Sequence, residues 1–125
     1  MKNSLFLLLF TAILLITCKP KKKFPGFDSE GWKLDKKACE GKREGFLKAY
    51  PNLKAELKGT DDDDLTDLFG NPEKTFYYGR GRKDYVYFIS PGSQCTNTYA
   101  LEGKELVIEI NALGFVNIAT EQQGK

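Results

Sequence analysis

The amino-acid sequence predicts an α+β domain, in which two N-terminal helices pack on one face of a four-stranded antiparallel meander sheet. The pattern of apolar residues changes once along the 125-residue chain. Between residues 35 and 69 apolar side chains recur at helical spacings, whereas from residue 73 onward they follow the period of two that is typical of strands. Helices that precede a run of strands, without alternating with them, favour the α+β class.

A strongly apolar segment comes before this domain. Residues 5–16 read LFLLLFTAILLI, in which Thr11 is the one polar residue. Twelve residues are too few to span about 30 Å of hydrocarbon, which needs about 20 in a helix, but they suit the core of a secretory signal peptide. A buried N-terminal helix is the alternative. The signal is favoured because nothing else in the chain has a matching apolar demand.

The end of this run resembles a bacterial lipoprotein signal, which is cut before the Cys of a Leu-x-x-Cys box so that the thiol can receive a diacylglycerol. Here the box reads Leu15-Ile16-Thr17-Cys18, with Thr17 where Gly, Ala or Ser is usual. The resemblance implies a membrane-attached protein of the cell envelope, anchored in the outer membrane and facing the periplasm. It divides the chain into a signal peptide over residues 1–17, the lipidated Cys18 and a tether over residues 18–33, and a folded domain over residues 34–122.

Charge is distributed unevenly along the chain. Residues 19–58 hold twelve Lys and Arg against six Asp and Glu, and residues 59–125 hold six against eleven. The lysines next to Cys18 would lie beside anionic headgroups, each contributing about 1 kcal/mol, or they would mark a solvated stop after the signal. No basic stripe with interleaved aromatic residues is present, so nucleic acid is not expected as a partner.

The chain contains no His. This excludes Ser-His-Asp and Cys-His nucleophiles, the HExxH metalloprotease helix and zinc sites that need an imidazole. We therefore expect no catalytic residue, cofactor or small-molecule substrate, and a protein that is not an enzyme. A carboxylate enzyme such as a glycosidase is the weakest alternative, with Glu105 and Glu109 as candidates, because so small a domain has little room for a substrate cleft.

Two cysteines remain once Cys18 is assigned to lipid. Outside the cytoplasm disulfides form and persist, so Cys39 and Cys95 are predicted to pair, closing a long loop worth about 4 kcal/mol in the chain-entropy model. A reactive thiol is the alternative. It is less favoured because the two residues are far apart and no His is present to lower a thiol pKa.

The first helix is predicted to run from Asp35, as N-cap, to about Tyr50. Pro51 must break or restart it, and a short apolar face with two leucines then continues to Gly59. The residues that define the helical spacing are Cys39, Lys42, Phe46, Ala49 and Tyr50.

The second helix is predicted over residues 60–69. Thr60 can cap it, the acidic run Asp61–Asp64 complements the positive helix end, and Gly70 stops it. A calcium site is the alternative reading of four consecutive Asp. The helix start is favoured because the alternating ligands, central Gly and distal Glu of an EF-hand are missing, and no metal site is predicted.

Four strands follow. Aromatic and β-branched residues define them, and their predicted ranges are 75–78, 85–89, 105–110 and 114–119. A Gly-rich turn at 79–84 joins the first pair, and a tight hairpin at 111–114 joins the last pair. The longer loop between these pairs carries Cys95, which could fasten the sheet to the first helix.

Alternation along these strands predicts a partner-binding face. Val86 and Phe88 are expected to face the helices, together with Leu106, Ile108 and Ile110 of the third strand. This leaves Tyr85 and Tyr87 on the other side, with Glu105, Val107 and Glu109. Arg80 and Arg82 lie in the neighbouring turn. Aromatic residues beside charges are common in protein interfaces, so the predicted binding residues are Tyr85, Tyr87, Arg80 and Arg82. Ordinary cross-strand Tyr pairing on a solvated face is an equal alternative.

These elements resemble the BamE (SmpA/OmlA) family of small outer-membrane assembly lipoproteins. The matching stretches cover roughly residues 59–120 and include Gly59-Thr60, Leu68-Phe69-Gly70-Asn71-Pro72, Tyr85-Val86-Tyr87 and the run from Leu106 to Val116. Asn111 takes the place of the usual Asp, and Ile110 that of an aromatic residue. The resemblance implies a β-lactamase-inhibitor-like fold and a role in outer-membrane assembly or maintenance.

The sequence as a whole predicts a lipid-anchored envelope protein. Its membrane contact is through Cys18, and its partner is another envelope protein that it binds as a non-enzymatic scaffold or adaptor. The alternative is an anchored or secreted inhibitor of an enzyme, which would use the same exposed sheet face.

Overall fold

The computed structural model describes residues 20–96 and 101–124. The predicted signal peptide and the lipidation site Cys18 lie outside these residues. Within the described ranges, no helix has the length and apolar character needed to cross a membrane.

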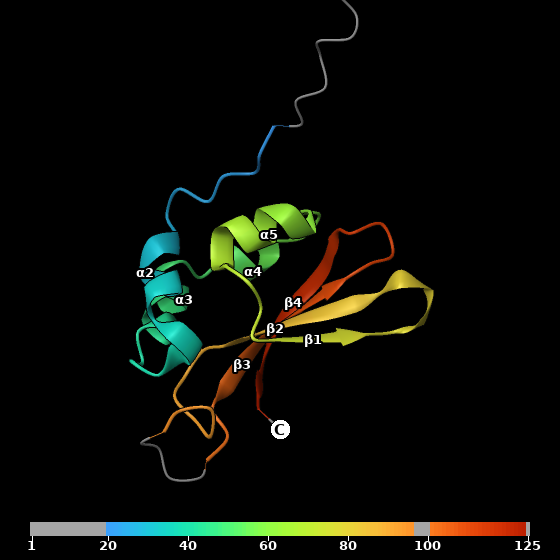
Figure 1. Ribbon diagram of the computed structural model, residues 1–125. Coiled ribbons are helices and arrows are strands. Elements are labelled where there is room, and N and C mark those ends of the chain that lie inside the picture. Colours follow the sequence, from blue (N-terminus) through green and yellow to red (C-terminus); the bar gives the residue numbers. More distant parts are fainter. Residues whose placement is uncertain (1–19, 97–100, 125) are drawn as a thin grey trace, which may run out of the picture.

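The described chain forms a helical layer on one side of a four-stranded sheet (Figure 1). The strands pair antiparallel in the order β1-β2-β3-β4, so the predicted α+β class with a meander sheet is confirmed. The helices are α2 (Ser29–Leu34), α3 (Arg43–Ala49), α4 (Leu53–Glu56) and α5 (Asp62–Phe69), and the strands are β1 (Lys74–Tyr77), β2 (Lys83–Phe88), β3 (Lys104–Ile110) and β4 (Val116–Gln123). Two short 3-10 turns are η1 (Lys36–Ala38) and η2 (Gly79–Gly81).

The fold begins earlier than the predicted boundary at residue 34. Asp28 caps α2 by accepting a hydrogen bond from the Gly31 N–H at 2.8 Å, and Trp32 within this helix is fully buried. Phe24 and Phe27 are also buried in the core. The segment predicted as tether through residue 33 therefore belongs to the domain from Phe24 onward.

The predicted helix from Asp35 to Tyr50 is wrong, because the chain turns sharply after α2. Lys37 and Ala38 have positive φ angles of 56° and 58°, which an α-helix cannot contain. The Asp35 carboxylate is buried and accepts hydrogen bonds from the backbone N–H groups of Glu40, Lys42 and Arg43. Asp35 thus closes this turn, and α3 begins only at Arg43.

Helix α5 forms where the acidic run predicts it. Its N-cap is Asp61, whose carboxylate accepts from the Asp64 N–H at 2.8 Å, and not Thr60 as predicted. Gly70 ends the helix with a φ of 80°, a conformation that glycine adopts without strain.

The core lies between the helical layer and one face of the sheet. Its centre is a group of aromatic rings whose centroids lie 5.1–6.4 Å apart, where edge-to-face contacts are favourable. These rings are Phe27, Trp32, Phe69 and Tyr87.

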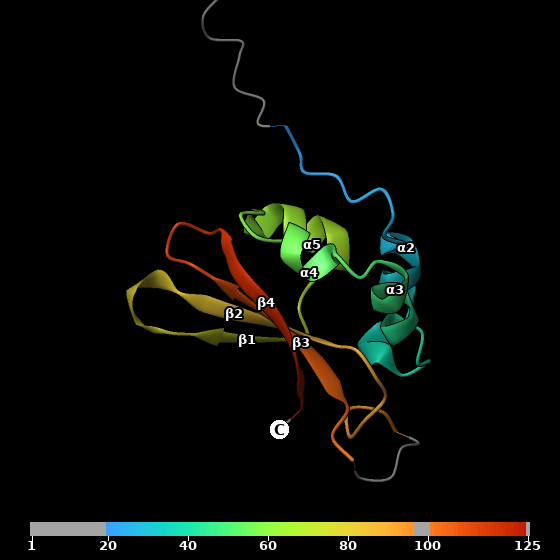
Figure 2. The same ribbon diagram turned by 180° about the vertical axis from the view of Figure 1, so that it is seen from behind.

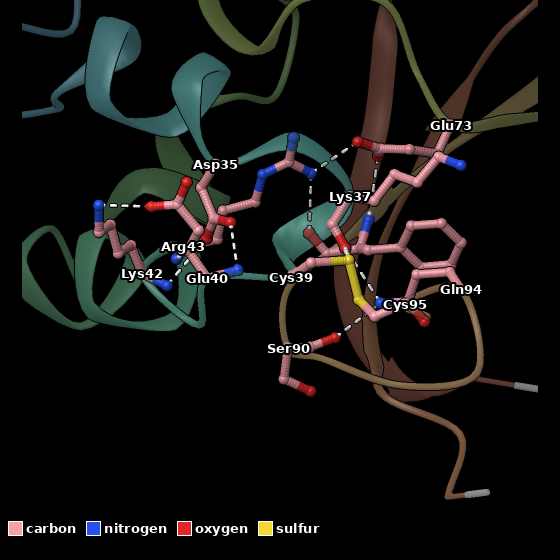
Figure 3. The surroundings of a disulfide bond; sticks show 11 residues. Asp35, Lys37, Cys39, Glu40, Lys42, Arg43, Glu73, Ser90, Gln94 and Cys95 are labelled. Atoms are coloured by element: carbon pink, nitrogen blue, oxygen red, sulfur yellow. Dashed lines mark hydrogen bonds and ion pairs between the residues drawn. A yellow bond between two sulfur atoms is a disulfide. The ribbon is translucent and has the colours of Figure 1, made fainter. Parts of the chain in front are cut away.

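The predicted disulfide is confirmed: Cys39 at the end of η1 bonds to Cys95 in the loop between β2 and β3 (Figure 3). The two Cα atoms lie 5.7 Å apart. The neighbouring Gln94 side chain donates hydrogen bonds to the carbonyls of Lys37 and Ser90, each at 3.0 Å. The loop that follows β2 is therefore held to the helical layer.

Candidate interaction surface

The strand register places the two tyrosines of β2 on the side of the helices. Tyr85 pairs with Ile108 and Tyr87 with Leu106, and direct partners in an antiparallel pair project from the same face. The prediction that Leu106 and Ile108 face the helices is correct. The prediction for β2 is wrong on both faces: Tyr85 and Tyr87 face the helices, whereas Val86 and Phe88 pair with Val107 and Glu105 on the opposite face.

Tyr87 shows why this phase is stable. Its side chain has no exposed surface, and its ring packs against Trp32 and Phe69. Its hydroxyl donates a hydrogen bond to the Gly70 carbonyl at 3.0 Å, so burial leaves no unpaired polar atom. Burial raises the pKa of the Tyr87 phenol above its ordinary value. Tyr87 is thus unavailable to a partner, and Tyr85, packed against the same core, is partly buried.

The two arginines lie in the predicted turn, and both are exposed. Arg80 lies in η2 and Arg82 follows it, and neither forms an ion pair within the described part of the chain. Arg82 lines a hollow of about 250 Å³ together with Tyr78, Asp84 and Glu109. The structure therefore brings Arg82 together with residues of the other sheet face, not with Tyr85 and Tyr87.

The second face of the sheet, here called the open face, is not covered by any helix of the described chain (Figures 1 and 2). By the strand register it consists of Lys74, Phe76, Asp84, Val86, Phe88, Glu105, Val107, Glu109, Ile118, Thr120 and Gln122. Val86 and Val107 form its buried centre, with 2% and 9% exposure. Phe76 and Ile118 are half-exposed, at 50% and 47%. An apolar surface of this kind on an uncovered sheet is typical of interaction sites.

One acidic residue on the open face has a basic partner. The Lys74 Nζ lies 2.7 Å from a Glu105 carboxylate oxygen and 5.1 Å from the centroid of the Phe88 ring. The Glu105 side chain is only 6% exposed, and burial of a carboxylate requires such a partner. This corner of the open face is therefore electrically neutral.

The hollow lined by Arg82 lies at the end of the open face next to the turn between β1 and β2, and most of its lining residues are polar. The Tyr78 hydroxyl donates a hydrogen bond to Asp84 at 3.0 Å. This hydrogen bond, with desolvation and the nearby Asp84 and Glu109 charges, raises the pKa of the Tyr78 phenol, which stays neutral near pH 7. The hollow can thus offer hydrogen-bonding and charged groups to a bound side chain.

A buried arginine that the sequence reasoning did not identify joins the helical layer to the sheet. Arg43 donates a hydrogen bond to Glu73 at 2.7 Å (Figure 3). It also donates to the Trp32 carbonyl at 3.2 Å and to the Phe88 carbonyl at 3.0 Å. Its guanidinium lies 4.7 Å from the centroid of the Trp32 ring. Because its donors face protein groups in the interior, Arg43 has a structural role.

The glycosidase alternative has no support in the geometry. Glu105 and Glu109 are four residues apart on β3, which corresponds to about 13 Å along a strand, whereas a catalytic carboxylate pair needs about 5–9.5 Å. Among the described residues there is also no group of three or more Cys, Asp or Glu side chains suited to hold a metal ion.

The N-terminal end of the described chain lies against α5. Lys21 forms an ion pair with Asp67, and the Lys22 N–H donates to Asp64 at 3.4 Å. This ion pair raises the pKa of Lys21 and lowers that of Asp67. The lysines predicted to lie beside lipid headgroups therefore include one that pairs with the acidic helix.

The strand sequence of β2 does not distinguish its two faces. Each phase begins with one charged residue, Lys83 ahead of the two tyrosines and Asp84 ahead of Val86 and Phe88, so alternation is equally compatible with either phase. The packing of the tyrosine rings against the core decides between the two phases.

Comparison of the chain with family models, curated proteins and solved structures finds no match.

Proposed function

We propose that this protein is a non-enzymatic, lipid-anchored protein of the cell envelope that binds another envelope protein through the open face of its sheet. The observation that carries the proposal is the uncovered face itself, with Phe76 and Ile118 half-exposed around a buried valine centre. Packing a partner there would remove exposed apolar surface from water, at about 25 cal/mol per Å².

The attachment point of the chain supports this use of the open face. Phe24 is buried in the core, and residue 20 leaves the domain on the helical side of the sheet (Figure 1). The chain from Cys18 to Phe24 has six Cα-to-Cα steps and spans at most about 22 Å. A lipid on Cys18 would therefore hold the helical layer close to the membrane, and the open face would point away from it.

The resemblance to BamE-like lipoproteins fits the proposal. That family combines a lipoprotein signal with helices and a β-meander, and it works in outer-membrane assembly. We propose the same class of role for this chain, as a scaffold or adaptor.

Photocrosslinking in intact cells tests the binding face. Phe76 is replaced by the photoreactive residue p-benzoylphenylalanine, and the control carries the same residue in place of Leu34, which is 76% exposed in the helical layer. We expect a discrete protein adduct from position 76 and none of the same mass from position 34. Equal adducts from both, or none from position 76, would contradict the proposal, and a single hydrolase as the partner would favour the inhibitor alternative.

Metabolic labelling with a fatty acid tests the anchor. Wild-type protein should incorporate the label, and Cys18→Ala should not, because the thiol is the proposed attachment point. Equal labelling of the two proteins would remove the anchor from the proposal but leave the binding face untouched.

A further inference from the structure

Four side chains form a straight row across the open face. The strand register pairs Phe76 with Asp84, Asp84 with Glu109, and Glu109 with Ile118. Direct partners on neighbouring antiparallel strands have Cβ atoms about 4.5–5.5 Å apart. The row therefore holds two adjacent carboxylates between two half-exposed apolar side chains.

The two carboxylates lack a basic side-chain partner in the part of the chain that the structure describes. Neither Asp84 nor Glu109 forms an ion pair with any residue in the described ranges, and Arg82, although it lines the same hollow, lies beyond ion-pair distance of both. Asp84 accepts one side-chain hydrogen bond, from Tyr78. Like charges directly opposite one another destabilise a strand pair, so this arrangement is unfavourable for the isolated domain.

At the other end of the open face, an acidic side chain does have a basic partner within the chain. Glu105 lies four residues before Glu109 on β3 and on the same face. It receives the Lys74 ammonium at 2.7 Å. Asp84 and Glu109 lack such a partner in the described structure. Their negative charge therefore remains accessible to a partner at the end of the face that adjoins the turn between β1 and β2.

We infer that the row Phe76–Asp84–Glu109–Ile118 binds a Lys or Arg side chain of the partner protein. The inference rests on the proposed function and names the chemistry of the partner at that site. The aliphatic stem of a Lys or Arg packs on apolar surface while its head stays polar, which matches a row with apolar ends and an acidic centre. The bound cation offsets the repulsion between the two carboxylates.

This arrangement also gives specificity. An acidic or purely apolar segment on the open face would desolvate two carboxylates without pairing them, which is unfavourable. A basic side chain, in contrast, can form ion pairs with both carboxylates. The row thus selects partners by excluding the wrong ones as well as by attracting the right one.

Glu109→Gln tests the inference, because this exposed side chain forms no ion pair with another residue of the described ranges. In cells that carry p-benzoylphenylalanine in place of Phe76, Glu109→Gln should lower the yield of the partner adduct about tenfold, as for loss of one charged hydrogen bond. Asp63→Asn is the matched control: it removes an exposed acid on α5, away from the row, and should leave the yield unchanged. The attached peptide of the partner should contain a Lys or Arg beside the crosslinked residue.

The outcomes separate this inference from the proposed function. An adduct of unchanged yield in Glu109→Gln would overturn the inference and leave the proposed binding face standing. No adduct from position 76 in the otherwise wild-type protein would remove both.

Thermal unfolding of the purified full-length protein in detergent gives a second, partner-free test. Because Glu109→Gln removes a like-charge contact, it should raise the midpoint by about 1–4 °C. A lowered midpoint would show that the Glu109 carboxylate stabilises the fold, which contradicts the unpaired row.

Discussion

The two faces of the sheet differ in the burial of their aromatic side chains and in the pairing of their polar groups. On the helical side Tyr87 is fully buried, and its one polar atom reaches the Gly70 carbonyl. On the open face Phe76 and Ile118 are half-exposed, and Asp84 and Glu109 stand opposite each other without a basic partner in the described chain. The helical side buries its aromatic rings inside the domain, whereas the open face leaves apolar and acidic side chains accessible to a second molecule.

The difference shows where stability and function separate in this domain. The helical side holds the aromatic rings and the buried Arg43–Glu73 pair. Substitutions there should therefore change the free energy of unfolding. Substitutions of the exposed side chains on the open face should change partner binding and leave stability nearly intact.

The largest expected effect is at Arg43. Arg43→Met leaves the Glu73 carboxylate, whose side chain is only 13% exposed, without its cation, and breaking a buried pair costs about 3–5 kcal/mol. Urea denaturation measures this loss. Lys42→Met is the control, since the Lys42–Glu40 pair is exposed and should cost no more than about 1 kcal/mol. Equal losses would mean that Arg43 does not join the layers.

The disulfide should rank next. The double substitution Cys39→Ser and Cys95→Ser opens a loop of 56 residues, and the expected cost is about 2–4 kcal/mol. The comparison of urea midpoints for wild type and variant, each with and without reductant, checks this. Reductant should lower the wild-type midpoint alone, and an unchanged wild-type midpoint would show that the bond does not contribute.

A smaller effect is expected at Tyr87. Tyr87→Phe removes the hydrogen bond to the Gly70 carbonyl, at a cost of about 1 kcal/mol. Burial raises the pKa of the Tyr87 phenol in the folded protein. Its contribution to the free energy of unfolding is therefore complete below about pH 10, where the phenol of the unfolded chain is also neutral. That contribution is lost as the pH rises further, because the unfolded chain then releases the phenol proton more readily than the folded protein. The unfolding free energy of Tyr87→Phe should therefore fall less than that of wild type between pH 9 and 11.5. Parallel curves would contradict the burial of this phenol.

The smallest effect on stability is expected on the open face. Phe76 is half-exposed, so Phe76→Ala should change the unfolding free energy by only about 0.5 kcal/mol. Urea denaturation beside Tyr87→Phe tests this ranking. A loss of several kcal/mol would show that Phe76 belongs to a packed core and that the face is not open.

Much of the fold could be predicted from the sequence, because it depends on local patterns. Period-two alternation predicted all four strands, and β2 runs from Lys83 where 85 was expected. Gly70 and the acidic first turn predicted α5. The pairing of Cys39 with Cys95 followed from the small number of cysteines and is confirmed.

The errors have a common cause in side-chain contacts that the spacing of residue types does not reveal. Asp35 looks like an N-cap, but its carboxylate binds N–H groups up to eight residues ahead and turns the chain. The sequence pattern predicts Tyr85 and Tyr87 on the exposed face, but Tyr87 belongs to the buried core and Tyr85 packs against it. Of the predicted binding residues, Arg82 adjoins the open-face hollow, whereas the row across the face depends on a register that spans all four strands.

Cysteine labelling tests the central claim most directly. Ile118→Cys should react readily with a small membrane-permeant maleimide in the purified protein, since the side chain is half-exposed. In intact cells a bound partner should protect it, whereas Ala55→Cys, at an exposed position on α4, should react in both settings. Labelling of Ile118→Cys at the same rate in cells and in purified protein would contradict a partner on the open face.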